Sequence, residues 1–351
     1  MKIAMLISGG VDSSVALKLL KDQGHDITAF YLKIWLEDEL ASIGGECPWE
    51  KDLSYVRQIC EDADVPLEIV PMQKEYFDTV VEYAISEVKV GRTPNPDIMC
   101  NNYVKFGLFC DKIDDTYEKI ATGHYAQVEE EDGVYYLKKT PDPIKDQTYF
   151  LGRLNQKQLK RVMFPIGHLA KNEVRELAEK YDLPNKKRKD SQGICFLGKV
   201  KYPEFLRHYL GEKPGDIIEF ETGEKVGDHE GFWYYTVGQR KGIKLSGGPW
   251  FVVNKDTEKN IVYVSKSYHD EDKSRNTLEV NDFNWFSGEA PKQTSLQVKL
   301  RHGEHFYQCE IEYLDSERAR ITLDSDDQGI AAGQFAVFYD GTRCLGAATI
   351  C

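Results

Sequence analysis

The first strand-like segment of the 351-residue chain constrains the fold more than any other feature. The apolar run KIAMLI (2–7) leads into SGGVDSS (8–14), and a helical pattern, VALKLLKD (15–22), follows directly. Glycines, serines and an aspartate at the junction of a strand and a helix cost stability unless the turn binds something. Such a turn presents backbone N–H groups and a helix N-terminus to an anion, so it predicts a phosphate site.

Each residue type in this turn suggests a role. Gly9 and Gly10 allow the backbone to approach a phosphate closely, and Ser8, Ser13 and Ser14 add hydroxyl donors. The aspartate between them, at position 12, could cap the helix or help to hold Mg²⁺. The Walker A ending GK[ST] is missing. The alternative is a tight strand-to-helix turn with an ordinary cap.

The first 200 residues alternate between strand and helix patterns. This alternation predicts parallel βαβ units in a sheet that is covered on both faces, an α/β fold of the Rossmann-like kind. The predicted strands cover 2–7, 26–32, 66–70 and 118–122. The predicted helices lie near 14–23, 51–63, 75–90 and 98–113.

After about residue 210 the chain becomes rich in short β segments separated by turn residues. This texture predicts one or two small antiparallel β domains or barrels, with DTEKN (256–260) as a hairpin loop and a boundary near 267–276. The β segments are GDIIEFE, GFWYYTVG, WFVVNKD, NIVYVS, LQVKLR, YQCEIEYL, RARITLD and QFAVFYDG. We therefore expect three domains, at residues 1–205, 206–272 and 273–351.

Composition narrows the functional classes. The chain has 45 Lys and Arg against 58 Asp and Glu, a formal charge of −13, which argues against broad non-specific binding of nucleic acid. Two basic islands, NKKRKD (185–190) and GQRKGIK (238–244), could still form local sites or be solvated loops. We see no signal peptide and no membrane-spanning run, and the eight cysteines lack a CxxC pair. These features favour the reducing cytoplasm.

Cysteine positions fall into two groups. Cys60 and Cys110 lie on apolar helix faces, and Cys309 lies on the inner side of a strand. We interpret these three, with Cys344 and Cys351 in the last β segment, as small buried hydrophobic residues.

Cys100 and Cys195 do not fit that interpretation. Cys100 follows the proline-rich loop of GRTPNPDIMCNN and falls in the first turn of a helix, where the dipole lowers a thiol pKa. Cys195 lies in KKRKDSQGICFLG, downstream of four cationic side chains that also favour the thiolate. Two activated cysteines in a nucleotide-binding domain suggest covalent sulfur chemistry, although two unrelated surface thiols are the alternative.

The motifs together resemble a known family. SGGVDSS is similar to the PP-loop of ATP pyrophosphatases, which cleave ATP between its α- and β-phosphates and adenylate a substrate. Nearly the whole chain resembles the tRNA-specific 2-thiouridylases, with motifs in the same order. The matching segments are SGGVDSS, GRTPNPDIMCN, IATGHYA (120–126), KDQTYFL (145–151), KDSQGICFLG (189–198), TVGQRKG (236–242) and GQFAVFYDG (333–341).

This resemblance implies a reaction and a set of catalytic residues. The O2 atom of the wobble uridine would attack the α-phosphorus of ATP, with Mg²⁺, to give an adenylated base and pyrophosphate. A sulfur-relay donor protein would load Cys195 as a persulfide, whose terminal sulfur passes to C2 of the base. Cys100 would either release sulfide or displace the spent sulfur, leaving a Cys100–Cys195 disulfide. Asp97 is the implied general acid–base.

The resemblance also implies the binding residues, and we assign none to a resident metal. The ATP site would comprise Leu6, Ile7, Ser8, Gly9, Gly10, Val11, Asp12, Ser13, Leu32 and Gly123. The flipped base and the anticodon loop of tRNA would contact Asn95, Pro96, Asp97, His124, Lys145, Asp146, Gln147, Arg301, His302 and Gln334. His302 stands where the family often has tyrosine.

Three other interpretations remain open from the residues. A PP-loop amide or argininosuccinate-type ligase would explain SGGVDSS, but it leaves the two cysteines and the β-rich third without a role. A redox-sensing RNA-binding protein would use the cysteines as a regulatory disulfide. An iron–sulfur cluster held by Cys100, Cys195 and a further ligand is chemically reasonable, although two spare cysteines are fewer than the usual four.

Overall fold

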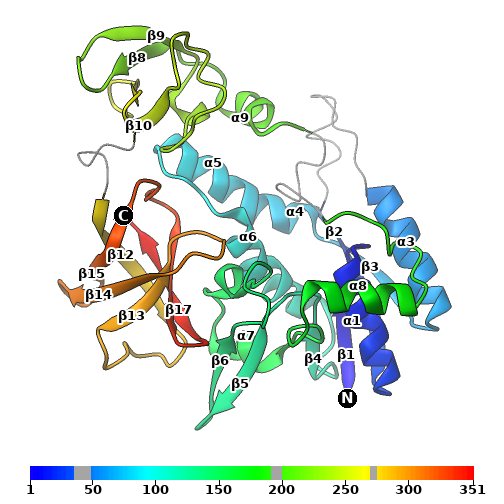
Figure 1. The fold of residues 1–351 in the computed structure, drawn as a ribbon. Helices are drawn as coiled ribbons and strands as arrows, with labels where there is room; N and C mark the ends of the chain where they lie inside the picture. Colours follow the sequence, from blue (N-terminus) through cyan, green and yellow to red (C-terminus); the bar gives the residue numbers. More distant parts are fainter. Residues whose placement is uncertain (35–48, 191–199, 269–274) are drawn as a thin grey trace.

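A five-stranded parallel sheet forms the centre of the N-terminal part. The computed structural model describes residues 1–34, 49–190, 200–268 and 275–351 (Figure 1). The strand order β3-β2-β1-β4-β7 confirms the predicted parallel α/β sheet, and β7 is a two-residue strand that the sequence pattern missed. The strands are β1 (Lys2–Leu6), β2 (Asp26–Lys33), β3 (Leu67–Pro71), β4 (Lys119–Ala121) and β7 (Val162–Met163).

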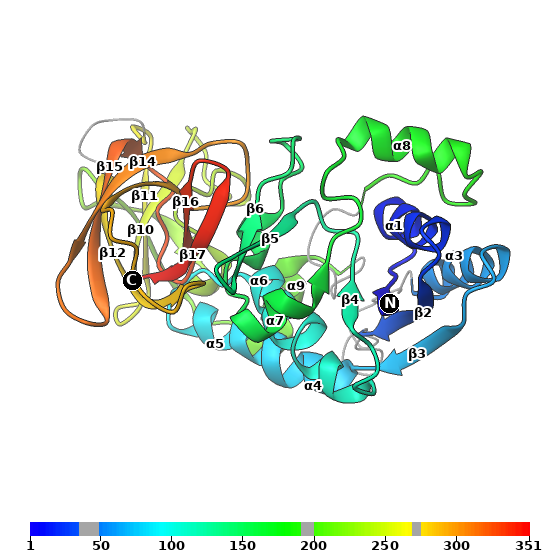
Figure 2. The same ribbon diagram turned by 90° about the horizontal axis from the view of Figure 1, so that it is seen from below.

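Helices cover both faces of this sheet because alternate residues of β1 point to opposite sides. Ile3 and Met5 pack in one cluster with three helices, whereas Ala4 and Leu6 pack in another with the helices of the opposite face (Figures 1 and 2). The first group is α1 (Val11–Asp22), α3 (Trp49–Asp62) and α8 (Lys171–Lys180). The second is α4 (Gln73–Tyr76), the π-helix η1 (Phe77–Val81), α5 (Glu82–Lys89) and α6 (Pro96–Met99).

The predicted helix over 98–113 is broken into three pieces. The α-helix α6 continues into the π-helix η2 (Cys100–Lys105), and after a turn the 3₁₀-helix η3 (Leu108–Lys112) follows. The turn between η2 and η3 requires glycine at position 107, since a Cβ there would lie 2.4 Å from the carbonyl oxygen of Tyr103. The sequence pattern did not predict α8 or three further helices that come before the second sheet, which are η4 (Thr148–Leu151), α7 (Gln156–Arg161) and α9 (Tyr202–Leu210).

A four-stranded sheet with order β10-β11-β8-β9 follows. The predicted hairpin at DTEKN is confirmed, because β10 and β11 pair in antiparallel fashion around it. Two expectations were wrong: β8 pairs with β11 in parallel, and GFWYYTVG contains the 3₁₀-helix η5 (Phe232–Tyr234) instead of a strand. The strands are β8 (Gly215–Glu219), β9 (Lys225–His229), β10 (Phe251–Asp256) and β11 (Ile261–Ser265).

Six strands at the C-terminus close into a barrel. The order β12-β15-β14-β13-β16-β17 is completed by pairing between β12 and β17, which confirms the predicted β-rich C-terminal part. The hairpin of β5 (Gln127–Glu131) and β6 (Val134–Lys138) extends from the N-terminal part and adds to β17. The barrel strands are β12 (Arg275–Trp285), β13 (Ser295–Lys299), β14 (Tyr307–Tyr313), β15 (Arg318–Asp327), β16 (Phe335–Asp340) and β17 (Arg343–Ile350).

The cysteine predictions are mostly confirmed. Cys60, Cys309 and Cys344 are buried in hydrophobic clusters. Cys110 is only partly buried, and Cys351 is exposed because it follows the last barrel strand, so burial was the wrong expectation for Cys351. In the part of the chain that the structure describes, no helix is long and apolar enough to cross a membrane.

Candidate nucleotide and base-binding site

The glycine turn adopts a conformation that requires glycine. Gly9 has φ of +76°, and a Cβ there would lie 2.7 Å from the carbonyl oxygen of Asp52. Gly10 is the N-cap residue of α1, and within the described chain no side chain caps this helix. The expectation that Asp12 caps the helix is therefore wrong: it is the second helical residue, and its carboxylate points elsewhere.

The serine hydroxyls brace the turn. Ser14 is buried and its Oγ donates to the carbonyl of Gly10 at 2.8 Å, while Ser13 Oγ donates to the same carbonyl at 3.1 Å. Ser8 N donates to Ser13 Oγ at 3.3 Å. The N–H groups of the first helical turn have no acceptor within the helix, so these groups are the donors that can meet an anion.

Loops from the two central strands meet at this turn. The order β3-β2-β1-β4-β7 places the topological switch point between β1 and β4, where ligands bind in open α/β sheets. Gly123, just after β4, packs on the start of α1: a Cβ there would lie 2.6 Å from Ser13 N. Leu32 lies near the end of neighbouring β2. Other predicted ATP residues have buried side chains and can offer only backbone groups, namely Leu6, Ile7 and Val11.

A charge network surrounds Asp12. Its carboxylate accepts from Lys171 Nζ at 2.7 Å and from the hydroxyl of Tyr125 at 2.8 Å. Lys171 also pairs with Asp190 at 2.8 Å, and Asp190 pairs with Lys145 at 2.7 Å. Burial acts to raise the pKa of Asp190, but hydrogen bonds from Lys145 and Lys171 outweigh it and lower the pKa to about 2. Asp190 is therefore ionised at neutral pH.

Two residues of the first basic island, NKKRKD (185–190), hydrogen-bond to the glycine turn. Asn185 Nδ2 donates to the carbonyl of Gly9 and to Ser14 Oγ, both at 2.9 Å. Arg188 donates to the same Gly9 carbonyl at 3.2 Å and pairs with Asp52 at 2.6 Å. The sequence pattern did not single out Asn185 or Arg188, because a basic run gives no sign that two of its residues bind a backbone carbonyl far away in the chain. It also did not single out Tyr125 and Lys171, whose contacts with Asp12 are equally distant in sequence.

A short helix carries the predicted base-binding residues. Asn95 caps α6 by accepting from Ile98 N at 3.3 Å, and Pro96 occupies the first helical position. Burial raises the pKa of Asp97, and the charge of Lys105 opposes this rise. The carboxylate of Asp97 accepts no hydrogen bond from the described residues, so it is available to a ligand.

The C-terminal barrel fixes this helix in place. Gln334 Nε2 donates to the carbonyls of Thr93 and Pro94 at 3.0 and 2.9 Å, and its Oε1 accepts from Asn95 Nδ2 at 3.2 Å. Tyr149 adds a bond from its hydroxyl to the carbonyl of Phe335 at 3.3 Å. The helix start is thus held by a residue about 240 positions away, which no local pattern could reveal.

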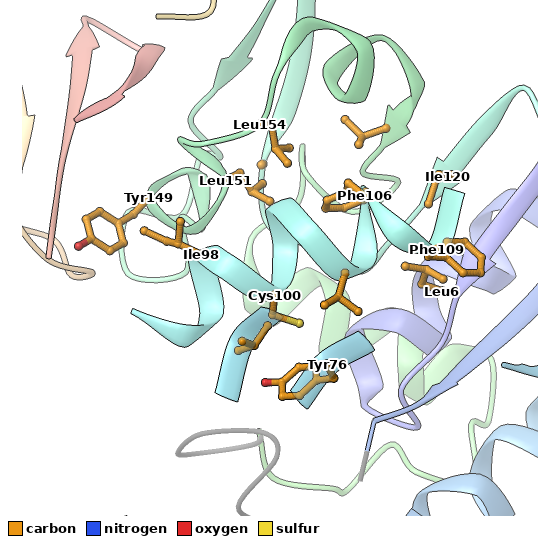
Figure 3. Close-up of a cluster of buried hydrophobic side chains, with 14 of the residues drawn as sticks. Leu6, Tyr76, Ile98, Cys100, Phe106, Phe109, Ile120, Tyr149, Leu151 and Leu154 are labelled. Atoms are coloured by element: carbon orange, nitrogen blue, oxygen red, sulfur yellow. The ribbon is translucent and has the colours of Figure 1, made fainter. Parts of the chain in front are cut away.

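Cys100 lies deeper than its sequence context predicts. The helix starts at Pro96, so Cys100 comes after its first turn, at the start of the π segment. The side chain is 2% exposed and packs in the cluster that contains Ile98 and Tyr76 (Figure 3). The predictions that Cys100 falls in the first turn of the helix and differs from the buried cysteines were therefore wrong. Cys195, and with it the predicted disulfide, lies outside the described residues.

The predicted tRNA contacts differ in accessibility. His124 packs between the rings of Phe106 and Phe164, and burial, aided by the charge of Lys105, lowers its pKa well below the usual value. Asp146 is 1% exposed and pairs with buried Lys299 at 3.4 Å, so only its backbone could meet RNA. The Oε1 atom of Gln147 accepts from Tyr125 N at 2.9 Å.

The remaining predicted contacts lie on the barrel. Arg301 pairs with the buried carboxylate of Asp327 while more than half of its side chain stays exposed. The ring of His302 lies 4.7 Å from that of Phe150, and burial lowers its pKa. A cavity of about 550 Å³ lies beside Arg301 and Gln334. Its wall includes Thr93 of the loop before α6, residues 236–238 between η5 and β10, and Tyr268 after β11.

Comparisons with known proteins agree along the whole chain. Three family profiles match in order: a tRNA methyl transferase HUP domain at 1–199, a tRNA methyl transferase PRC-barrel domain at 203–266 and an aminomethyltransferase beta-barrel domain at 275–350. A tRNA-specific 2-thiouridylase of Parabacteroides distasonis is 47% identical over 356 residues, covering 100% of this chain and 99% of that protein.

The chain belongs to the tRNA-specific 2-thiouridylase family. A second thiouridylase, from Bacteroides thetaiotaomicron, is 45% identical over 359 residues, covering 100% of this chain and 99% of that protein. Among solved structures, a 4-thiouridine synthetase in complex with RNA and ATP aligns at 17% identity and a TM-score of 0.33, over 56% of this chain and 45% of that one. A likeness at that level says nothing about function.

In this thiouridylase the two halves of the predicted site touch. The ring of Phe106, the residue after η2, lies 6.2 Å from that of His124. His124 follows Gly123, which packs on the glycine turn. The helix of Asp97 and Cys100 is thereby joined to the loop after β4. Within the described residues, no group of three or more His, Cys, Asp or Glu side chains could hold a metal.

Proposed function

We propose that this chain uses ATP to convert the wobble uridine of tRNA into 2-thiouridine. The observation that carries the proposal is the contact between the two halves of the site. Gly123 packs on the phosphate-facing turn while its neighbour His124 packs on the helix that bears Asp97 and Cys100. A nucleotide on the turn and a base beside the helix would thus lie close enough to react.

The glycine turn would bind the phosphates of ATP through N–H groups of the first turn of α1. Mg²⁺ fits this site only as a partner of the nucleotide, because the one carboxylate at the turn is Asp12 and Lys171 already pairs with it. Magnesium commonly binds through one or two carboxylates plus substrate phosphates. Bound there, it would neutralise phosphate charge during adenylation.

Asp97 would serve as the general base for adenylation. As O2 of uridine bonds to the α-phosphorus, the bond to the bridging oxygen breaks and pyrophosphate leaves with the electron pair. The proton on N3 of the base then passes to the Asp97 carboxylate. The raised pKa of Asp97 suits this task, since a base works best when its pKa approaches the operating pH.

Sulfur transfer would use both cysteines. The terminal sulfur of a Cys195 persulfide, delivered by an upstream donor protein, attacks C2, and AMP departs with the former O2. The Cys100 thiolate then attacks the Cys195 sulfur and displaces the thiolated base, which regains a proton at N3. This leaves a Cys100–Cys195 disulfide, which an external thiol reductant must reduce. Because Cys100 is 2% exposed, this step requires a local opening of the helix.

The anticodon loop would lie across the junction of the N-terminal part and the barrel. Arg301 and Lys145 offer cationic side chains there, and His302 and Phe150 offer rings on which bases can stack. Local basic contacts of this kind are compatible with the net charge of −13. We place the protein in the cytoplasm on the same proposal.

A reconstituted reaction tests the function. Purified chain, ATP, Mg²⁺ and unmodified tRNA are incubated with a persulfide donor, and digested nucleosides are analysed by mass. We expect 2-thiouridine and one AMP and one pyrophosphate per thiolation, with product lost in Cys195→Ser. Pyrophosphate exchange driven by amino acids without tRNA would favour a ligase. A methylated base formed from S-adenosylmethionine without ATP would favour the methyl transfer named in the family profiles.

A further inference from the structure

Lys105 is a partly buried cation with few partners. Its ammonium donates to Asn101 Oδ1 at 2.9 Å, and it forms no ion pair with any residue that the structure describes. Asn101 is 2% exposed and donates in turn to the carbonyl of Phe150 at 3.1 Å. An ammonium carries three donors, so two remain for a ligand. Because Lys105 is only partly buried, its two other donors can reach a bound anion.

The helix sets Lys105 on the same face as the predicted general base. Asp97, Asn101 and Lys105 follow one another at intervals of four residues along the continuous helix of α6 and η2. Residues at this spacing are neighbours on a helix surface. The π segment ends at Lys105, and such segments occur frequently at functional sites.

Lys105 also adjoins the nucleotide half. Phe106, the next residue, contacts His124, and Gly123 beside it packs on Ser13 at the glycine turn. The positive charge of Lys105 acts to lower the pKa of both Asp97 and His124. Figure 3 shows Cys100 and Phe106, which flank this segment, on one helix. Lys105 therefore lies on the segment that connects the helix of Asp97 with the loop packed on the glycine turn.

We propose that Lys105 is a further catalytic residue, whose ammonium hydrogen-bonds the non-bridging oxygens of the α-phosphate during adenylation. This inference rests on the proposed function. As the O2–phosphorus bond forms and pyrophosphate leaves, negative charge builds on those oxygens, and a preorganised cation stabilises it. Lys105 transfers no proton, since the N3 proton goes to Asp97. A neutral His124 beside it would not compete for the phosphate.

The test compares Lys105→Met and Lys105→Arg with Lys157→Met, a control at an exposed position of α7. Pyrophosphate release is measured with saturating ATP and tRNA, with melting temperatures recorded alongside. We expect Lys105→Met to lower kcat by about 100-fold or more, as removal of one oxyanion donor does elsewhere, with KM for ATP nearly unchanged. Lys105→Arg should recover part of this loss, and Lys157→Met should match the wild type.

A second readout separates catalysis from folding. Ethylammonium added to Lys105→Ala should restore pyrophosphate release, which a merely structural lysine would not show. Retention of at least half the wild-type kcat in Lys105→Met, or an activity loss that follows melting temperature and resists rescue, would overturn the assignment. If the wild type itself forms no 2-thiouridine, the proposed function fails. If the wild type forms it and the Lys105 variants release pyrophosphate as fast as the wild type, this inference alone fails.

Discussion

The glycine turn at 8–14 and the helix at 95–105 are both short, but different forces hold them in place. Residues within the turn determine its conformation: the positive φ at position 9 requires glycine, Gly10 is the N-cap of α1, and serine hydroxyls donate to the carbonyl of Gly10. The helix depends on Gln334 from the distant barrel. One motif is therefore enough to specify the phosphate-binding half of the site, the glycine turn. The position of the base-binding half, the helix of Asp97, depends on contacts with distant parts of the chain.

The largest expected effect comes from the turn itself. Gly9→Ala would force a Cβ against the backbone of Asp52 and a strained positive φ, so we expect a fall of about 100-fold or more in kcat/KM for ATP and a loss of about 2–4 kcal/mol in unfolding free energy. Gly10→Ala is the matched control for folding, since its Cβ would meet nothing closer than 3.4 Å. Equal melting temperatures for both variants would contradict the local account.

Gln334→Ala tests the long-range half. Losing its bonds to Thr93, Pro94 and Asn95 would free the start of α6, so we expect kcat with tRNA to fall about tenfold while ATP affinity stays constant. Gln308→Ala, at an exposed position of β14, is the control. If Gln334→Ala weakens ATP binding as much as it lowers kcat, the glycine turn also depends on Gln334, and the two halves of the site are not positioned independently.

The carboxylates of the two halves should respond to pH with opposite sign. The pKa of Asp190 is lowered, so its contribution to stability is present above pH 3.8 and lost as pH falls toward about 2. After allowance for solvent screening, Asp190→Asn should destabilise the protein by about 1 kcal/mol at pH 7.

The pKa of Asp97 is raised, so ionisation there opposes folding and stability is lost as pH rises from 3.8 through the higher folded-state value. We therefore expect Asp97→Asn to be more stable than the wild type at pH 7 and equal to it in acid. Denaturant unfolding of both variants between pH 2 and pH 8 measures the differences. A destabilised Asp97→Asn at neutral pH would refute the assigned environment.

Thiol accessibility gives the smallest effect. Brief alkylation of the native protein, followed by peptide mass mapping, should label exposed Cys351 and leave buried Cys100 nearly unmodified. Cys351→Ala should change the unfolding free energy by less than about 0.5 kcal/mol, as surface substitutions usually do. Rapid labelling of Cys100 without substrates would mean that its helix opens spontaneously.

The sequence predicted four of the five strands of the parallel sheet, the α/β class and the β-rich remainder, because hydrophobic periodicity and glycine position are local signals. It missed the β5–β6 hairpin on the barrel, since edge pairing with β17 is decided by contacts more than 200 residues apart. It also placed Cys100 too close to the surface, because the apolar environment of that thiol comes from Tyr76 and other residues of separate helices. Lys171, Asn185 and Arg188 were missed for the same reason.

The central claim is that the base oxygen itself attacks the nucleotide at the junction of the two halves. Transfer RNA carrying ¹⁸O at O2 of the wobble uridine tests this most directly, when thiolation is run to completion and AMP is analysed by mass. The account predicts one ¹⁸O in AMP for each 2-thiouridine formed. Label recovered in water or in pyrophosphate, with unlabelled AMP, would contradict it.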